Sequence, residues 1–292
     1  MVEFLVGVDG GGSGTRALLA RRDGGVVGAG QAGPSALSRG IAPAWDAIEA
    51  AVRQAFDAAG LAPAPWSACA LGAGLSGASH APWGEAFVAA NIGFAHLVLD
   101  SDSFTMLLGA HAGQPGAVVV AGTGSVGEVL RVDGSRTSVG GWGFPIGDEG
   151  SGAWLGWHAV RHAQAAIEGR APAGALARRV WALCGGEPGA LLDWCRAAGQ
   201  FEYAQLAPVV FDVEASDARA TSLLASAVTE LEALAFALDP LGQLPLAVSG
   251  SVGRRLAPRF APALRSRCVE LAEGADAGAL TLIRRALHEA AA

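Results

Sequence analysis

Lysine is absent from this chain, and all twenty basic residues are arginine. The absence excludes sites that need an ε-ammonium group: the Walker A lysine, the strand lysine of protein kinases and a Schiff-base lysine. In a polyphosphate site without lysine, we expect backbone N–H groups, hydroxyls and a metal ion to neutralise the charge.

Cysteine and charge are also scarce. The four cysteines are far apart and form no C-x-x-C motif, which indicates free thiols in a reducing compartment. Charged residues make up only 16% of the chain and its net charge is −7, which argues against nucleic-acid and anionic-membrane partners. The long uncharged spans 58–84 and 103–127 are interrupted by proline and glycine, so neither predicts a membrane helix.

The start of the chain does not look like a secretory signal. Residues 1–20 lack a basic start and contain Glu3 and Asp9. We expect a cytoplasmic protein.

The strongest motif is the glycine-rich segment from Val6 to Arg16, which predicts two strands joined by a tight turn. Glycine allows backbone N–H groups to approach an anion, so Gly11 and Gly12, with the hydroxyls of Ser13 and Thr15, are candidate phosphate ligands. Asp9 is placed to hold a hydrated metal ion beside that anion. A plain β-hairpin with a glycine-rich turn is the alternative.

A second copy of this hairpin is predicted at 119–127, where an apolar strand runs into Gly122, Thr123 and Gly124. Such an internal repeat is a stronger signal than either half. The glycine spacing also matches G-x-G-x-x-G, but the residues that follow alternate like a strand, whereas a dinucleotide fingerprint requires a helix there. A third, weaker turn of this kind contains Gly250, Ser251 and Gly253.

Asp102 is the candidate catalytic base, because it follows a buried strand and precedes a helix, where open α/β sheets place ligands. The alternative is an N-cap for a helix that starts at Ser103. Asp100, expected one residue beyond the strand, competes for the catalytic role.

The loop 140–152 is too rich in glycine for a regular element. It contains Trp142 and two carboxylates, including Asp148, and it precedes a helix expected over 153–168. These residues suit a sugar ligand. His158 and His162 lie four residues apart on that helix, and a helix face is a better interpretation than a metal site.

The remaining pattern is that of an α/β protein with a mixed sheet. It begins as three strands, continues as alternating strands and helices, and divides near 113–115. Helices are expected over 43–59, 173–184, 189–198, 202–214, 218–238 and 276–291, and the last strand over 267–271.

Together these motifs resemble the BadF/BadG/BcrA/BcrD ATPase family of the sugar-kinase/actin/heat-shock ATPase superfamily, and its N-acetylglucosamine and glucosamine kinases in particular. The resemblance spans nearly the whole chain, and its most specific part is Gly-Thr-Gly-Ser at 122–125 with Gly-Asp-Glu-Gly-Ser-Gly at 147–152. It implies two ribonuclease-H-like domains, the actin-like ATPase fold, closing over ATP and Mg²⁺ at an interdomain cleft. The implied domains are 1–113, joined by the terminal helix 276–292, and 114–275.

The resemblance also assigns roles to residues. It implies that both glycine hairpins grip the phosphates, that the turn 250–253 contacts the adenosine, and that Asp102 accepts the proton of the sugar 6-hydroxyl. The implied sugar pocket contains Ser76, Gly77, Asp102, Thr123, Trp142 and Asp148. The family's sugar kinases commonly carry asparagine where Ala36 stands here, which bears on which amino sugar is used.

Two other functions compete with an amino-sugar kinase. An activator ATPase of the same family would share an iron–sulfur cluster between subunits, for which Cys184 is the only thiolate candidate. A non-catalytic nucleotide sensor would not need Asp102. A homodimer is expected on family grounds alone.

Overall fold

The computed structural model describes residues 2–290, so residues 1, 291 and 292, including the end of the expected terminal helix, lie outside it. The chain divides into two compact units, which are described separately: unit 1 contains residues 1–116 and 270–292, and unit 2 contains residues 117–269. The boundaries expected from the sequence, after residues 113 and 275, lie close to these.

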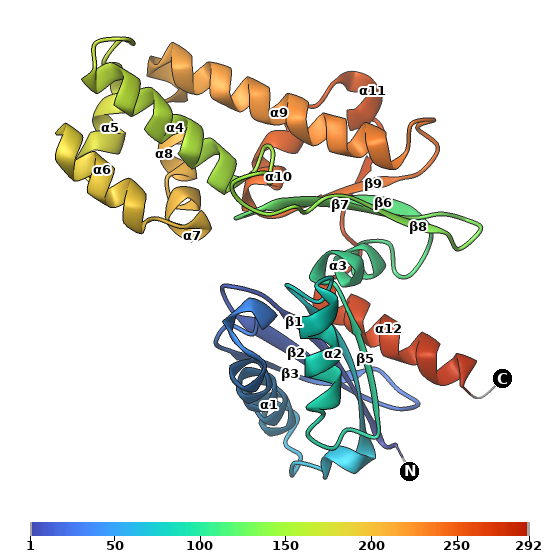
Figure 1. The fold of residues 1–292 in the computed structure, drawn as a ribbon. Coiled ribbons are helices and arrows are strands. Elements are labelled where there is room, and N and C mark those ends of the chain that lie inside the picture. The colour runs from blue at the N-terminus through green and yellow to red at the C-terminus, as the bar shows by residue number, and fades with distance from the viewer. Residues whose placement is uncertain (1, 291–292) are drawn as a thin grey trace. The chain divides into compact units, whose positions relative to one another are not determined.

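Unit 1 is a five-stranded mixed sheet in the order β3-β2-β1-β4-β5 (Figure 1). The strands are β1 (Phe4–Gly10), β2 (Thr15–Arg21), β3 (Val26–Ala32), β4 (Cys69–Leu75) and β5 (His96–Asp100). The first three strands form an antiparallel meander, and β4 and β5 run parallel to β1. The carboxyl ends of β1, β4 and β5 therefore meet at one edge of the sheet, where open α/β sheets bind ligands.

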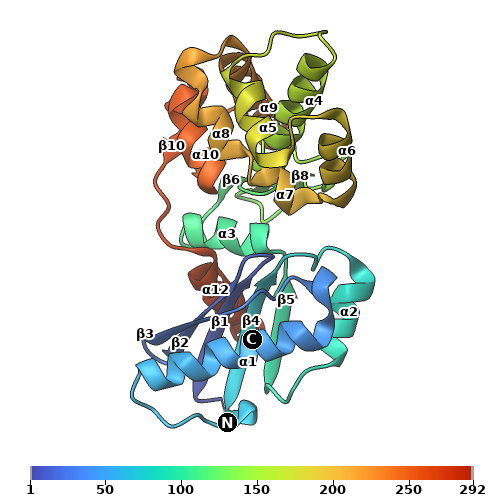
Figure 2. The ribbon, with the colours of Figure 1, turned by 90° about the vertical axis from the view of Figure 1, so that its left-hand side faces the viewer.

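Four helices cover the two faces of this sheet: α1 (Ile41–Ala58), α2 (Ala81–Ala89), α3 (Asp102–Ala110) and α12 (Ala275–Glu289). Helix α1 buries its apolar face against one side, and α12 packs on the other side (Figure 2). Helix α12 approaches β1 closely, since a Cβ at Gly7 would lie 2.3 Å from the carbonyl oxygen of Asp276. The chain's last helix is thus part of the first unit.

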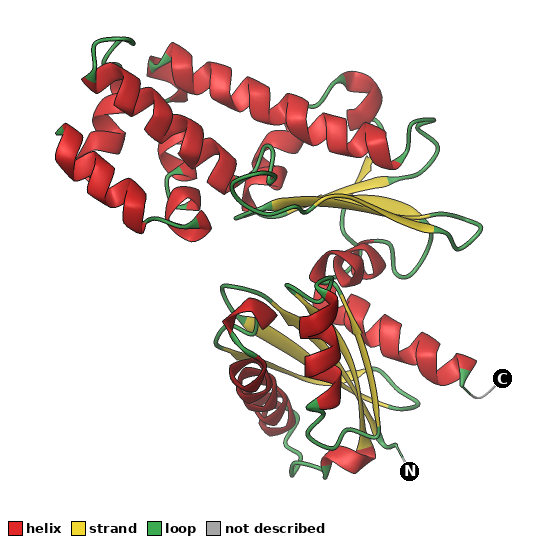
Figure 3. Ribbon diagram, in the orientation of Figure 1, coloured by secondary structure: helices red, strands yellow, loops and turns green. Residues whose placement is uncertain are grey.

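Unit 2 contains a second five-stranded mixed sheet, in the order β10-β9-β6-β7-β8 (Figure 3). Its strands are β6 (Gly116–Ala121), β7 (Ser125–Leu130), β8 (Arg136–Gly140), β9 (Leu246–Ser249) and β10 (Cys268–Val269). Its helices are α4 (Gly152–Ile167), α5 (Ala175–Cys184), α6 (Pro188–Ala197), α7 (Gln200–Ala204), α8 (Ala207–Asp212), α9 (Ala218–Leu238), α10 (Ser251–Leu256) and α11 (Pro262–Arg265). Two mixed sheets with helices confirm the α/β class.

The long helix α9 is a core element of unit 2. Leu224, Leu231 and Leu238 are fully buried on it, and it is the one described helix that is long and apolar enough, by those criteria alone, to cross a membrane. The core helix of a soluble protein meets the same criteria, so α9 is weak evidence of a membrane span.

Several expected boundaries were wrong. The single helix expected over 202–214 is interrupted between α7 and α8, where Pro208 stands in the first turn of a new helix. Proline has no N–H to donate and its ring clashes with a preceding carbonyl, so it kinks or breaks a helix that would run through it. The last strand is only Cys268–Val269, and Asp100 is the final residue of β5 rather than lying beyond it.

Candidate active site

A row of polar residues crosses one face of the unit 1 sheet near the carboxyl ends of its strands. Asp9 is in register with Arg16 on β2 and with Gly74 on β4, and Gly74 is in register with Asp100 on β5. Register partners direct their side chains to the same face. Thr105 of α3 covers Gly74, because a Cβ there would lie 1.9 Å from the Thr105 hydroxyl oxygen. Two carboxylates therefore lie two strands apart on one face, with a hydroxyl between them.

Asp9 is held by an ion pair. Its Oδ2 lies 2.5 Å from a guanidinium nitrogen of Arg16, and its side chain is only 19% exposed. Burial raises the pKa of Asp9, and Arg16 opposes that rise. The described residues contain no group of three or more His, Cys, Asp or Glu side chains that could hold a metal ion by themselves. The single carboxylate of Asp9 fits Mg²⁺, which is usually bound through one or two carboxylates and the phosphates of a substrate.

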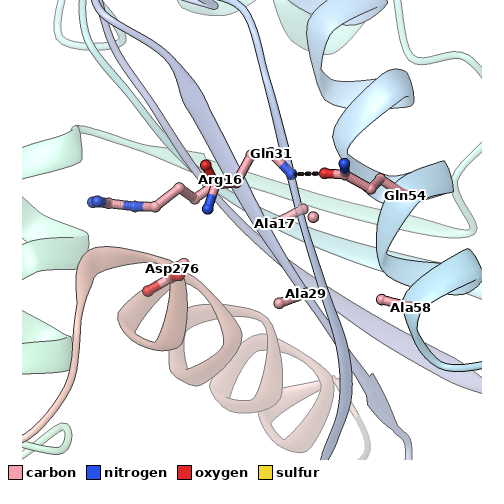
Figure 4. A pocket seen from close by; sticks show the side chains of 8 residues that line it. Arg16, Ala17, Ala29, Gln31, Gln54, Ala58 and Asp276 are labelled. Atoms are coloured by element: carbon pink, nitrogen blue, oxygen red, sulfur yellow. Dashed lines mark hydrogen bonds between the residues drawn. The ribbon is translucent and has the colours of Figure 1, made fainter.

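A hollow lined by Arg16 lies among β2, β3, α1 and the first turn of α12 (Figure 4). Arg16, Gln31 and Asp276 line it, and the side chain of Gln54 on α1 accepts a hydrogen bond from the backbone N–H of Gln31. The motifs read from the sequence did not indicate it.

The first glycine turn is fixed by its own backbone and by a neighbouring loop. Gly11 donates to the carbonyl of Gly14 at 3.0 Å, and the Gly11 carbonyl accepts from Ser35 and Ala36 at 3.1 and 3.2 Å. In a trans peptide the carbonyl and the following N–H point in opposite directions. The N–H of Gly12 therefore points away from the loop at 35–36, and Gly12 is exposed.

Two hydroxyls of this turn have different surroundings. Ser13 is exposed, whereas Thr15 is 2% exposed, and its Oγ1 lies 2.7 Å from both the Gly33 carbonyl and Oγ of Ser35. The predicted phosphate contact of Thr15 stays a prediction, because the structure directs its hydroxyl into the protein.

The predicted sugar residues Ser76 and Gly77 lie beside the same turn. Ser76 donates its N–H to the Gly10 carbonyl at 2.9 Å and accepts from the N–H of Leu37 at 3.0 Å. Unit 1 thus gathers the ends of β1 and β4 and the loop at 35–37 into one place.

Asp102 is the first residue of α3, and it is not the N-cap. Ser101 has that role, since its Oγ accepts from the N–H of Phe104 at 3.1 Å. The N-cap alternative for Asp102 is therefore wrong. Oδ1 of Asp102 accepts from the N–H of Ser103 at 2.9 Å, and Oδ1 of Asp100 accepts from the N–H of Ser101 at 2.7 Å. Each aspartate thus accepts a hydrogen bond from the backbone N–H of the next residue.

The second glycine turn, in unit 2, is one residue shorter than the first, but the carbonyl of its first glycine is also held by a neighbouring segment. Gly122 donates to the carbonyl of Gly124 at 2.9 Å, and the Gly122 carbonyl accepts from Gly152 at 2.8 Å. The Thr123 carbonyl accepts from Ala153 at 3.0 Å. The first turn of α4 therefore holds this turn, and the N–H of Thr123 points away from α4.

The third turn packs directly on the second. A Cβ at Gly250, whose φ is +84°, would lie 2.1 Å from the carbonyl oxygen of Ala121. Ser251 is exposed, whereas Gly253 is buried against Val248 of β9. The close approach explains why glycine stands at 250, and the adenosine contacts of these residues stay predictions.

Asp148 is buried and links three segments of unit 2. It is 3% exposed, its Oδ1 accepts from the N–H of Ser125 at 3.2 Å, and its Oδ2 accepts from Nε2 of Gln200 at 2.7 Å. Burial raises the pKa of Asp148, and the two hydrogen bonds oppose the rise. Its backbone has a φ of +65°. Strain of this kind at a non-glycine residue persists where the surroundings over-determine it.

Trp142 has the opposite environment. It is 82% exposed on the loop between β8 and α4, and so is available to a ligand. His158 and His162 are half-buried on α4, where burial and then Arg219 lower the pKa of both.

Three residues of this geometry were missed in the sequence. The pairing of Asp9 with Arg16 follows from hairpin register once the turn is centred near residue 12, so that signal was present. No signal in the sequence indicated Ser35 or Gln200, because their partners lie 20 and 52 residues away.

Comparisons with known proteins give the chain its relatives. A sequence model described as the BadF/BadG/BcrA/BcrD ATPase family matches residues 6–255. The chain is 30% identical over 288 residues to glucosamine kinase GspK of Vibrio cholerae, covering 98% of each chain. It is 44% identical to a protein of solved structure from Chromobacterium violaceum, provisionally assigned as an N-acetylglucosamine kinase, with a TM-score of 0.93 over 97% of this chain and 99% of that one. A similarly assigned Porphyromonas gingivalis structure shares the fold at 17% identity, with a TM-score of 0.68 over 98% and 99%.

Proposed function

This chain belongs to the BadF/BadG/BcrA/BcrD ATPase family, and we propose that it is an ATP-dependent amino-sugar kinase that phosphorylates the 6-hydroxyl of glucosamine or N-acetylglucosamine. Full-length similarity to a glucosamine kinase and to a structure assigned as an N-acetylglucosamine kinase supports the amino-sugar class. The choice of hydroxyl and the residue roles below are our own proposals.

The observation that carries the proposal is the shared construction of the two glycine turns. In each turn the carbonyl of the first residue, Gly11 or Gly122, is held by a neighbouring segment, so the next N–H faces outward. No hydrogen bond from the N–H of Gly12 or Thr123 is found within the described residues. Outward N–H groups in a glycine turn form an anion site that requires no lysine.

Catalysis in this proposal consists of positioning and charge neutralisation. The sugar 6-hydroxyl oxygen attacks the γ-phosphorus of ATP, the bond from that phosphorus to the β–γ bridging oxygen breaks, and ADP leaves. The hydroxyl proton passes to the carboxylate of Asp102. Backbone N–H groups of the two turns stabilise the phosphate oxygens.

Mg²⁺ would neutralise phosphate charge when bound. Asp9 is the residue that fits it, because its carboxylate is partly buried, paired with Arg16 and adjacent to the first turn. The Arg16 guanidinium and the hydrated ion would then share the Asp9 carboxylate.

The residues proposed to bind the sugar are described here unit by unit. Ser76 and Gly77 supply a loop beside the first turn, Trp142 offers an exposed aromatic face, and Asp148 and Thr123 flank the second turn. An aromatic face suits the apolar side of a sugar ring.

A kinase assay across glucosamine, N-acetylglucosamine, N-acetylmuramic acid and glucose tests this function, with ADP release measured at saturating Mg·ATP. We expect an amino sugar to have the highest kcat/KM. Turnover of none of the four above the rate of ATP hydrolysis without sugar would refute it.

The properties of Cys184, the candidate iron–sulfur ligand, argue against the activator-ATPase alternative. Cys184 is buried, and burial raises the pKa of its thiol to about 11. A cluster shared between subunits requires an accessible thiolate.

We propose a cytoplasmic location, since all four cysteines are free thiols. A homodimer remains a prediction that sedimentation would test.

A further inference from the structure

Gln200, a side chain from the helical part of unit 2, bonds to a predicted sugar residue. Its Nε2 donates to Oδ2 of Asp148 at 2.7 Å, across 52 residues of sequence. A carboxylate only accepts hydrogen bonds, so the amide nitrogen must face Asp148 and the amide oxygen must face away from it.

The surroundings leave this pair little freedom. A Cβ at Gly124 would lie 2.5 Å from Oδ1 of Asp148 and 3.0 Å from Nε2 of Gln200, so the second glycine turn lies directly against both groups. The other oxygen of Asp148 is already occupied by the N–H of Ser125. Glycine at 124 therefore provides the space in which Gln200 reaches the carboxylate.

The backbone that carries Gln200 is also fixed. Helix α7 begins at Gln200, and the side chain of Glu202 accepts from the N–H of Gly199 at 2.8 Å. A Cβ at Gly156 would lie 1.8 Å from the Tyr203 carbonyl oxygen, so α7 packs backbone to backbone on α4. The ring of Tyr203 in turn contacts Phe144 in the Trp142 loop, at 5.1 Å between centroids.

We infer that Gln200 is a positioning residue for sugar recognition, which fixes the orientation of the Asp148 carboxylate. This inference rests on the proposed amino-sugar kinase activity. Each carboxylate oxygen has more than one acceptor direction, so a sugar hydroxyl can bond to Asp148 while Gln200 and Ser125 hold it.

Charge is the second part of the argument. Burial raises the pKa of Asp148, and Glu149, the charged group that acts on it, raises it further. The Ser125 N–H and the Gln200 amide lower it. Without the amide the carboxylate would bind a proton at higher pH and lose an acceptor for the sugar.

The test compares Gln200→Leu and Gln200→Glu with a matched control, Gln205→Leu. Gln205 lies at the exposed end of the same helix. Thermal unfolding first shows that each variant is folded. KM for glucosamine, KM for ATP and kcat are then measured from pH 6 to 8.5.

We expect Gln200→Leu to raise KM for the sugar about tenfold, because it removes a hydrogen bond to a charged group. KM for ATP should change less than twofold, and the acid limb of the sugar-affinity profile should move to higher pH. Gln200→Glu should bind sugar poorly at pH 8.5 and recover towards pH 6, where a carboxyl proton can replace the amide donor. Gln205→Leu should match the parent.

The inference is overturned if Gln200→Leu keeps the parent's KM for sugar and its pH profile, or if KM for ATP rises as much as KM for sugar. These outcomes are read in a parent protein that phosphorylates an amino sugar. A parent that phosphorylates none refutes the proposed function, and the inference with it.

Discussion

Replacement of Asp102 by asparagine separates a catalytic role from a structural one. Asparagine keeps the side-chain oxygen that accepts from the N–H of Ser103 at 2.9 Å, but it cannot accept a proton. Ser101, not Asp102, caps α3, so the substitution leaves the cap intact. Asp100→Asn is the matched control, because that carboxylate also accepts from the next backbone N–H, at 2.7 Å.

The expected sizes of the two effects are far apart. Removing a general base costs a factor of about 10²–10⁴ in kcat, or about 3–5 kcal/mol in activation free energy. The loss of a negative charge in the first turn of α3 costs about 0.3–1 kcal/mol of stability. A folded protein with near-normal ATP affinity and a kcat lowered at least a hundredfold is therefore the predicted phenotype.

The assay couples ADP release to NADH oxidation at saturating glucosamine and Mg·ATP, with ATP affinity measured separately by calorimetry. If Asp102→Asn retained near-normal turnover while Asp100→Asn abolished it, the assignment of the base would be wrong. If Asp102→Asn weakened ATP binding as strongly as it lowered kcat, the residue would be acting on the nucleotide instead.

Three further predictions follow from the same geometry. Gly124→Ala should lower the free energy of unfolding in urea by about 1–3 kcal/mol, because its Cβ would lie 2.5 Å from Oδ1 of Asp148. Gly122→Ala is the control and should be nearly neutral, because its Cβ meets nothing within 4 Å. Equal losses in the two variants would contradict crowding at Gly124. Burial raises the pKa of Asp148, so its contribution to stability is complete below the unfolded pKa near 3.8 and is lost as the pH rises through the higher folded pKa. Asp148→Asn should therefore gain stability relative to the parent as the pH rises through the mildly acidic range. A pH-independent difference in urea unfolding would refute this. Asp9→Asn should raise the Mg²⁺ concentration that gives half-maximal activity while KM for sugar is unchanged; an unaltered Mg²⁺ titration would remove Asp9 from the metal site.

Local patterns predicted much of the fold. Alternation and glycine turns located the meander of unit 1 and the repeat at 119–127, and the strand after Gly122–Gly124 is β7, as expected. Those signals lie within a few residues of the structures that they specify. The break at Pro208 was missed, although proline in the first turn of a helix is a local signal of a new start.

The site was less predictable because its contacts join distant segments. Asp148 was expected to face a ligand pocket, and the structure shows both its oxygens engaged by Ser125 and Gln200. Thr15 was expected to face an anion, and its hydroxyl is directed at the Gly33 carbonyl and Ser35. In both cases the residue type suited a ligand, but the tertiary fold determines which distant segment bonds to the side chain.

The two glycine turns show how a repeated motif acquires a fixed geometry from unrelated neighbours. The Gly11 carbonyl is held by the loop at 35–36, and the Gly122 carbonyl by the first turn of α4. The repeat is visible in sequence, but these two holding segments share no motif. Because each carbonyl is fixed, the next peptide N–H is fixed too, and the charge that a lysine would supply is replaced by oriented backbone dipoles. Anion affinity in this chain should therefore depend more on the segments that hold the turns, such as 35–36 and 152–153, than on the side chains of Ser13 or Thr123.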